Sequence, residues 1–128
     1  MKNFFQNKRV LVTGASGFVG TNLIKKLVML GAKVTGTTFK NKPQIIIPEV
    51  NLVNIDLTQA ENCDSICKEQ EYIFMAAANS SGAEIIEKQP LTHLTPNVIM
   101  NSLMLKSAYS SGVKKFCFIS SNTVYPMT

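Results

Sequence analysis

Three glycines near the N-terminus, Gly14, Gly17 and Gly20, have the residue type and spacing that phosphate binding requires. Glycine at 14 allows a tight turn, glycine at 17 omits the Cβ where a pyrophosphate approaches the backbone, and glycine at 20 allows close packing of a following helix. The N–H groups that begin such a helix attract an anion. The pattern predicts a dinucleotide site, with a plain strand–turn–helix packing motif as the alternative. The predicted contacts in this turn are Gly14, Ser16, Gly17, Phe18, Val19 and Gly20.

The elements around this turn alternate between strand-like and helix-like patterns. An apolar β-type run precedes the turn, and apolar residues at helical spacing follow it until Gly31. Such alternation predicts an α/β protein with a doubly wound parallel sheet, and right-handed crossovers favour the strand order 3-2-1-4-5. The predicted strands are 9–13, 33–38, 50–55, 72–76 and 115–120, and the predicted helices are 18–30, 59–68 and 96–111, with a loop at 41–49.

This strand order places three segments at one edge of the sheet. Ligands of open parallel sheets bind where the strand order reverses, at the carboxyl ends of the strands. Residues 14–20, 76–82 and 120–125 should therefore converge there. The small side chains of Ala76, Ala77 and Ala78 would let the backbone lie beside the ribose and pyrophosphate of a cofactor.

The segment from Thr13 to Gly20, with its Gly-x-x-Gly-x-x-Gly spacing and Phe-Val insert, resembles the extended short-chain dehydrogenase/reductase family. These proteins are NAD(P)-dependent epimerases and dehydratases of nucleotide sugars. The resemblance implies a Rossmann-type fold, a nucleotide-sugar substrate and hydride transfer at sugar C4. It runs through nearly the whole chain but covers only the first part of a family member. We therefore expect residues 1–128 to be a partial NAD(P)-binding Rossmann domain, truncated after strand five, with the substrate lobe absent.

The resemblance also implies roles for three residues in the middle of the chain. Asp56 would accept the amino group of adenine, and the backbone N–H of Leu57 would serve a ring nitrogen. The alternative for Asp56 is a cap on the helix that begins near Gln59. Asn97 occupies the position of the family's helix asparagine, which supports the catalytic region. Its alternative is an exposed residue at a helix N-terminus following Pro96.

The end of the second predicted strand bears on the choice of cofactor. Thr38 stands where family members often have an aspartate for the ribose hydroxyls, so no carboxylate is present there to repel a 2′-phosphate. Lys40 is close enough in sequence to approach such a phosphate, although it is alternatively a solvated loop residue. These two residues favour NADP over NAD.

Ser121 is the predicted catalytic residue of this chain. In the family, the hydroxyl residue four positions before the tyrosine of the Tyr-Pro pair (here Tyr125) hydrogen-bonds the reacting oxygen of the substrate. Ser120 and Thr123 are supporting candidates, and a serine turn is the alternative. The family's proton carrier is a tyrosine with a lysine four residues later. None of the three tyrosines of this chain has that lysine, so we expect the chain to be inactive alone.

Two patterns narrow the subgroup that the chain resembles. The Ala76–Ala78 run and the Ser-Ser-x-x-Tyr-Pro pattern are similar to GDP-fucose synthase-type epimerase/reductases. Thr123 stands where that subgroup carries a cysteine for epimerisation, which leaves 4-reduction or 4-epimerisation open. The pair Asn122-Thr123 replaces the Asp-Glu pair of 4,6-dehydratases.

The bulk composition excludes several classes. The net charge is +5, but the lysines are scattered without interleaved aromatic residues, which argues against nucleic-acid binding. No run of eighteen apolar residues or signal-peptide pattern is present, so we expect a cytoplasmic protein without membrane attachment. One histidine and three cysteines, Cys63, Cys67 and Cys117, do not supply a metal site, and none is predicted.

The predicted helix 96–111 is the expected partner surface. In the family this helix builds a homodimer, and here Met100, Leu103, Met104 and Leu105 would be partly uncovered. Besides the enzyme interpretation, a non-catalytic NADP-binding redox sensor or interaction module remains open. A folded domain that binds no ligand is the third interpretation.

Overall fold

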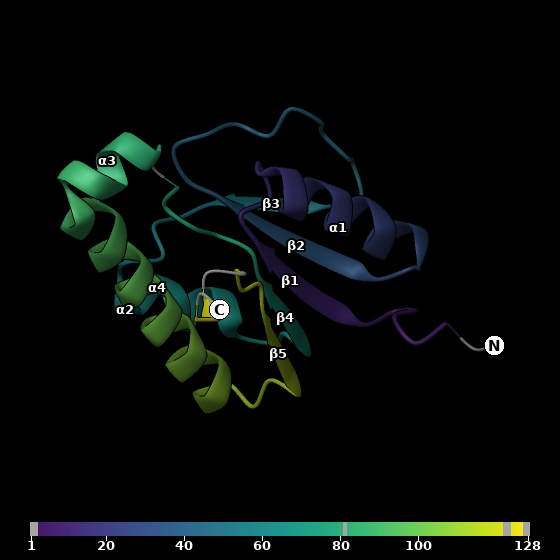
Figure 1. Ribbon diagram of the computed structural model, residues 1–128. Helices are drawn as coiled ribbons and strands as arrows, with labels where there is room; N and C mark the ends of the chain where they lie inside the picture. The colour runs from purple at the N-terminus through teal and green to yellow at the C-terminus, as the bar shows by residue number, and fades with distance from the viewer. Residues whose placement is uncertain (1–2, 81, 122–123, 127–128) are drawn as a thin grey trace.

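A computed structural model describes residues 3–80, 82–121 and 124–126. Strands and helices alternate along the chain except at two places: β3 follows β2 directly, and α4 follows α3 (Figure 1). The elements are β1 (Arg9–Thr13), α1 (Phe18–Met29), β2 (Lys33–Thr38), β3 (Asn51–Asn54), α2 (Ala60–Cys67), β4 (Tyr72–Met75), α3 (Ala83–Lys88), α4 (Pro90–Ser110) and β5 (Lys115–Phe118).

The five strands form one parallel sheet in the order β3-β2-β1-β4-β5. Central β1 pairs with β2 on one side and β4 on the other, so Val12 lies between Gly36 and Phe74. The predicted fold class and strand order are therefore confirmed. The reversal of strand order lies between β1 and β4, as expected for a doubly wound sheet.

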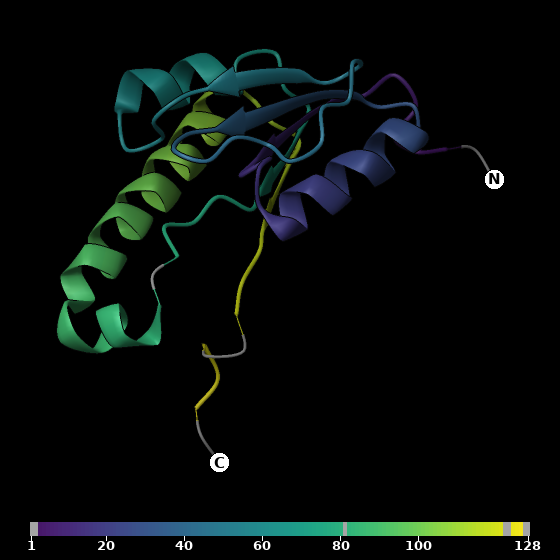
Figure 2. The same ribbon diagram turned by 90° about the horizontal axis from the view of Figure 1, so that it is seen from above.

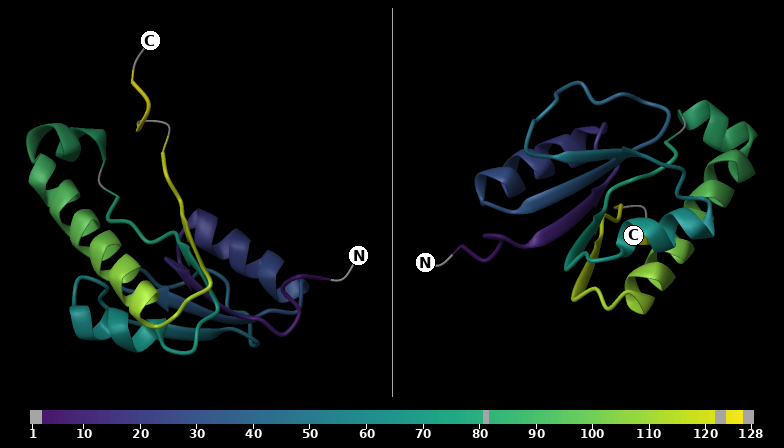
Figure 3. Two further views of the ribbon diagram at one scale, coloured as in Figure 1. Left: turned by 90° about the horizontal axis from the view of Figure 1, so that it is seen from below. Right: turned by 180° about the vertical axis from the view of Figure 1, so that it is seen from behind.

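Each face of the sheet has its own apolar core. Because side chains alternate along a strand, Val10 and Val12 face α1 and pack with Ile24 and Leu27, while Leu11 faces the opposite side. Figures 2 and 3 show α1 on one face of the sheet, and α2 packed beside α4 on the other. The buried residues of the second face are Leu11, Leu57, Cys63, Ile66, Cys67, Ile73, Met75, Met104 and Ala108.

A charged cluster joins three strands at the amino edge of the sheet. The Glu71 carboxylate, just before β4, accepts hydrogen bonds from the backbone N–H of Arg9 at 2.9 Å and from Nζ of Lys114 at 3.0 Å. These two bonds, with the nearby charges of Arg9 and Lys114, lower the pKa of Glu71 from 4.5 to about 2. The cluster therefore ties the starts of β1, β4 and β5 together.

The main departure from the sequence predictions is the start of the long helix. We predicted a helix over 96–111, but α4 begins at Pro90 and contains Pro96 inside it. Proline at the first helical position has no hydrogen bond to lose, so Pro90 is a compatible start. The short α3 was not predicted. The other helix and strand ends lie within one or two residues of the prediction.

We predicted that four apolar residues of α4 would be partly uncovered, and for Met104 this prediction is wrong. Met104 is fully buried, and Met100 and Leu103 pack partly buried against the core. Leu105 is exposed, as expected, with 55% of its surface accessible. The exposed apolar side chains of the helix instead lie mainly on its outer side: Leu91, Leu94, Val98, Ile99, Leu105 and Tyr109.

All three cysteines are free thiols. Cys63 and Cys67 lie one turn apart on α2 and are buried in the core, whereas Cys117 on β5 is exposed. Burial, reinforced by the nearby charge of Asp64, raises the pKa of Cys63 to about 11. Burial, with Cys63 as the next cause, raises the pKa of Cys67 to about 12.

Candidate functional site

The turn between β1 and α1 requires glycine at two positions for reasons of packing. Gly14 has a φ of +73°, and a Cβ on it would lie 2.8 Å from the carbonyl oxygen of Ala76. A Cβ on Gly20 would lie 2.0 Å from the carbonyl oxygen of Gly14. Gly17 differs, because its Cβ would meet only the Gly14 oxygen at an ordinary 3.4 Å. Protein packing therefore explains Gly14 and Gly20 but leaves Gly17 unexplained.

The first turn of α1 presents its backbone at the surface. Gly17 is the N-cap residue, and no side chain caps the helix or places an acid in its first turn. The first N–H groups of a helix have no carbonyl partner within it, so they can donate to an anion. Phe18 and Val19 are exposed, and Ser16 is half-buried. This end of α1 has the properties of a phosphate site.

The side chain of Thr13 joins this turn to the loop after β4. Its fully buried hydroxyl accepts hydrogen bonds from the backbone N–H of Ala76 at 3.1 Å and of Ala77 at 3.0 Å, and contacts Sδ of Met75 at 3.2 Å. The sequence reasoning used Thr13 only as part of the motif and did not assign it a role. The signal that could have identified it is a hydroxyl at the last position of an otherwise apolar strand.

The loop after β4 is also fixed by α4. The backbone N–H of Asn79 donates to Oδ1 of Asn97 at 2.7 Å, and Nδ2 of Asn97 donates to the Asn79 carbonyl at 3.0 Å. Nδ2 of Asn97 also reaches the carbonyl of His93. Because α4 begins at Pro90, Asn97 is inside the helix, and the alternative of a helix-terminal residue is wrong. Asn97 thus holds the Ala76–Asn79 segment, of which Ala78 is exposed.

The carboxyl ends of β2 and β3 carry the residues expected near an adenosine. The hydroxyl of buried Thr38 accepts a hydrogen bond from Nδ2 of Asn54 at 3.3 Å. Lys40 is exposed, with Nζ 5.7 Å from the centre of the Phe39 ring. Its positive charge contributes slightly to the lowered pKa of Asp56, which follows β3 at the same edge of the sheet.

Asp56 shapes the turn that leads into α2. Its Oδ1 accepts hydrogen bonds from the backbone N–H and the hydroxyl of Thr58 at 2.9 and 2.7 Å. These bonds are the main cause that lowers the pKa of Asp56, with a smaller contribution from Lys40. The N-cap of α2 is Gln59, not Asp56. The alternative role that we considered for Asp56, a cap on this helix, is therefore replaced by a turn with Thr58 just before the helix. The side chain of Leu57 is buried in the core, which leaves only its backbone for a ligand.

Ser120 and Ser121 follow β5 and are both exposed. The backbone N–H of Ile119 donates to the Met75 carbonyl at 3.1 Å, so this segment leaves the sheet beside the loop after β4. Figure 2 shows residues 119–121, directly after β5, leaving the edge of the sheet. The supporting candidate Thr123 lies outside the described residues.

The three predicted segments therefore leave the sheet at the same edge, and two of them are in contact. Residues 14–20 pack against Ala76 and Ala77, and residue 119 lies beside the end of β4. Thr38, Lys40 and Asp56 are farther along this edge, at β2 and β3. The structure brings the predicted residues to one edge of the sheet, and their roles toward a cofactor stay predictions.

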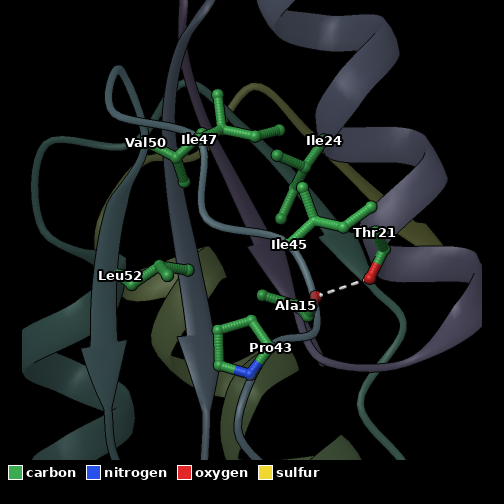
Figure 4. Close-up of a pocket in the computed structure, with 8 residues that line it drawn as sticks. All are labelled: Ala15, Thr21, Ile24, Pro43, Ile45, Ile47, Val50 and Leu52. Atoms are coloured by element: carbon green, nitrogen blue, oxygen red, sulfur yellow. Dashed lines mark hydrogen bonds between the residues drawn. The ribbon is translucent and has the colours of Figure 1, made fainter.

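The loop 39–50 closes over the α1 side of β2 and β3. Figure 4 shows Pro43, Ile45 and Ile47 against Ala15 and Ile24, with the Thr21 hydroxyl bonded to the Ala15 carbonyl at 3.0 Å. The space between them is about 10 Å³, about what a single water molecule needs. This contact is therefore packing that holds the loop beside the glycine turn. A broader hollow of about 540 Å³ lies at the opposite, amino edge of the sheet, away from the predicted site.

His93 lies on α4, partly buried, rather than on a loop. Its Nδ1 is buried without a hydrogen-bond partner among the described residues. Within that same part of the chain, no three His, Cys, Asp or Glu side chains are grouped to hold a metal ion. Nor is any helix there long and apolar enough to span a bilayer.

Comparison with curated proteins finds relatives that act on several substrates. A GDP-mannose 3,5-epimerase of rice (Oryza sativa subsp. indica) is 28% identical over 122 residues, which are 92% of this chain and 32% of the rice protein. A GDP-L-fucose synthase of Arabidopsis thaliana is 26% identical, covering 94% of this chain and 34% of that protein. A 3 beta-hydroxysteroid dehydrogenase/Delta 5-->4-isomerase of Mycobacterium tuberculosis is 31% identical, covering 91% and 32%. The chain spans about a third of the length of these relatives.

Solved structures and family models agree with this relationship. An epimerase from Methanothermobacter thermautotrophicus superposes with a TM-score of 0.83 at 27% identity, covering 94% of this chain and 37% of that chain. The model of the NAD dependent epimerase/dehydratase family matches residues 10–128. Because this match includes nearly the whole chain, the protein belongs to the NAD-dependent epimerase/dehydratase family.

Proposed function

We propose that this chain forms the dinucleotide-binding part of an NADP-preferring epimerase or reductase that acts on a nucleotide sugar. The observation that carries the proposal is the contact of the glycine turn with the loop after β4. Thr13 fixes the backbone of Ala76 and Ala77 directly beside Gly14. Two backbone segments with small side chains thus lie together at the reversal of strand order, which is where dinucleotides bind in such folds.

The residues at this edge fit a dinucleotide cofactor. Gly17 is the position at which protein packing leaves room for a Cβ, so a close ligand explains the glycine there. The N–H groups of the first turn of α1 would hold the pyrophosphate, and the backbone of Ala76–Ala78 would line the ribose. When bound, the nicotinamide would supply hydride exchange at sugar C4.

The chain's own residues would orient the substrate and the cofactor. Ser121 would donate a hydrogen bond to the oxygen on C4 and so polarise it. Ser120 is a supporting residue beside it. Asn97 would act indirectly, because its two hydrogen bonds to Asn79 fix the loop that carries Ala76–Ala78.

The adenosine end supports a preference for NADP. Thr38 is neutral and buried, so no carboxylate at this position repels a 2′-phosphate. Lys40 is exposed and follows β2 by two residues, at the edge where the adenosine would bind. In this proposal Asp56 accepts the adenine amino group and the backbone N–H of Leu57 donates to the ring.

A second candidate is a non-catalytic NADP-binding module that senses redox state or binds a partner. It is favoured by one observation: Tyr72 and Tyr109 are followed four residues later by Ala76 and Val113, not by lysine. For either function we place the protein in the cytoplasm as a homodimer that contacts its copy through α4, since free thiols suit a reducing compartment and apolar side chains are exposed along that helix.

The test is calorimetric titration of the chain with NADP⁺, NADPH and NAD⁺. The proposal expects saturable binding, tighter for NADP⁺ than for NAD⁺, that Gly17→Ala weakens strongly. Absorbance at the reduced-nicotinamide band in the presence of GDP- or UDP-sugars is a second readout, in which any turnover would rule out the module. Because we expect the chain to be inactive alone, the ratio of its NADPH and NADP⁺ affinities is what separates the two candidates. Binding of neither dinucleotide by a folded chain would refute both candidates, and a strong preference for NADPH over NADP⁺ without turnover would favour the module.

A further inference from the structure

Pro96 creates an unpaired carbonyl inside α4. A residue in a helix normally donates its N–H to the carbonyl four residues earlier, but proline has no N–H. The carbonyl of Thr92 therefore has no helical donor at position 96. Instead, Nδ2 of Asn79 donates to the Thr92 carbonyl at 3.3 Å. The side chain of a loop residue thus occupies the position that a helical N–H would otherwise fill.

Asn79 is consequently held at three atoms. Its backbone N–H and carbonyl both bond to the side chain of Asn97, at 2.7 and 3.0 Å, and its side chain bonds to Thr92. The three partner atoms belong to two residues of the N-terminal half of α4: Thr92, before Pro96, and Asn97, directly after it. A proline ring inside a helix also crowds the carbonyl four residues earlier, which here is the Thr92 carbonyl that accepts the bond from Asn79.

This anchor lies next to the segment assigned to the cofactor. Ala76 and Ala77 are fixed by the Thr13 hydroxyl, and Asn79 is fixed by α4. Ala78, which is exposed, is therefore held from both sides. Preorganisation of a backbone segment strengthens binding, because less conformational freedom is lost when the ligand arrives.

We propose that Pro96 is a positioning residue for the dinucleotide cofactor. It removes the N–H that would compete for the Thr92 carbonyl, reserves this acceptor for Asn79, and so holds Ala78 in the conformation that faces the cofactor. The inference rests on the proposed dinucleotide site. A proline that is merely tolerated would change the stability of the helix and leave the cofactor affinity as it is.

The first test is Pro96→Ala, which restores the helical donor. The unfolding temperature should rise, because alanine is the better helix residue. The Kd for NADP⁺ should nevertheless increase about threefold to tenfold, the range that loss of one hydrogen bond produces. Hydrogen exchange at the Asn79 amide should become faster in the free protein. Pro90→Ala is the matched control, because a first-turn proline has no helical bond to restore.

The second test is a double-mutant cycle with Asn79→Ala, which removes the side-chain bond and keeps both backbone bonds. Asn79→Ala alone should weaken NADP⁺ binding about as much as Pro96→Ala. If both act through the same bond, the double variant should bind no more weakly than Asn79→Ala alone.

The outcomes separate this inference from the function on which it rests. Additive losses in the cycle, or unchanged affinity and amide exchange in Pro96→Ala, would overturn the inference while the dinucleotide site stands. A wild-type chain that binds neither NADP⁺ nor NAD⁺ would overturn the proposed function, and the cofactor role of Pro96 with it. In that case faster exchange at Asn79 in Pro96→Ala would still establish the anchor as a structural feature alone.

Discussion

The carbonyl oxygen of Gly14 lies 2.0 Å from the place that a Cβ of Gly20 would occupy. Gly20→Ala must therefore displace the turn, at a cost of about 3 kcal/mol in the free energy of unfolding. Gly17→Ala meets no such contact, and its φ of −80° suits alanine, so the only cost is that of a poorer N-cap residue, about 1 kcal/mol or less. Chemical denaturation of the two variants, followed by NADP⁺ titration, checks this pair. Gly17→Ala should instead lose affinity for NADP⁺ with little loss of stability. Equal losses of stability in the two variants would contradict this prediction.

Thr13→Val keeps the shape of the side chain and removes the acceptor for two backbone N–H groups. The N–H groups of Ala76 and Ala77 would be left unpaired, which should cost about 2 kcal/mol or more of unfolding free energy. Thr13→Ser keeps the hydroxyl and loses only a buried methyl group, at about 1 kcal/mol. Cofactor titration separates the variants further, since only valine should release the loop after β4. An equal effect of serine and valine on NADP⁺ affinity would show that the hydroxyl does not hold this loop.

Lys40→Ala should change the choice of cofactor. A charge-assisted bond to a 2′-phosphate would be lost, so NADP⁺ binding should weaken about tenfold while NAD⁺ binding stays the same. Lys26→Ala on α1 carries the same change in net charge and is the control. Both affinities are measured by calorimetry at two salt concentrations. A parallel loss for NADP⁺ and NAD⁺ would assign Lys40 to general attraction instead of 2′-phosphate recognition.

The Glu71 cluster should make the stability of the fold depend on pH in acid. The pKa of Glu71 is about 2 in the folded chain against an ordinary 4.5, so the carboxylate form is favoured by folding. Its stabilising contribution is complete above about pH 4.5 and is lost as the pH falls toward 2. Glu71→Gln should therefore be less stable than the wild type near neutral pH, and the difference should shrink in acid. Urea unfolding at pH 7, 4 and 2.5 measures the difference, and one that stays constant would contradict this expectation.

The outer side of α4 should mediate self-association. Leu91, Leu94, Val98, Leu105 and Tyr109 fall on one side of the helix by their spacing, and between 52% and 88% of each is accessible. A charge at Val98 or Leu105, as in Val98→Lys, should shift the chain toward monomer in sedimentation velocity. Met29→Lys on α1 removes an apolar side chain that is 79% exposed and should leave the association unchanged. A wild-type chain that is monomeric at high concentration would contradict the prediction.

Local sequence patterns were sufficient for the sheet. The apolar run before Gly14 and the alternation of strand and helix signals predicted the strand order, because right-handed crossovers leave few alternatives. The start of α4 was less predictable. Pro96 normally indicates the first turn of a helix, and its cost inside α4 is offset by a side chain from Asn79, which is seventeen residues earlier in the sequence.

The candidate site was predictable by segment but less so by contact. The glycine spacing located the turn, yet only the structure shows that Gly14 and Gly20 are required by packing and Gly17 is not. The hydrogen bonds that Thr13 and Asn97 make to the loop after β4 depend on which segments are adjacent in space, and this cannot be read from the sequence alone. Met104 was misplaced because an apolar helix pattern does not reveal how far around the helix the core extends.

The three thiols differ in burial, so one of them can be labelled selectively. At neutral pH the thiolate is the reactive form, and the buried Cys63 and Cys67, with pKa values of about 11 and 12, are almost entirely protonated. Cys117 is the exposed thiol, and it stands on β5 just before the segment that leads to Ser120 and Ser121. A maleimide dye should therefore label the native protein at a single position beside the proposed substrate end, without any cysteine being removed first.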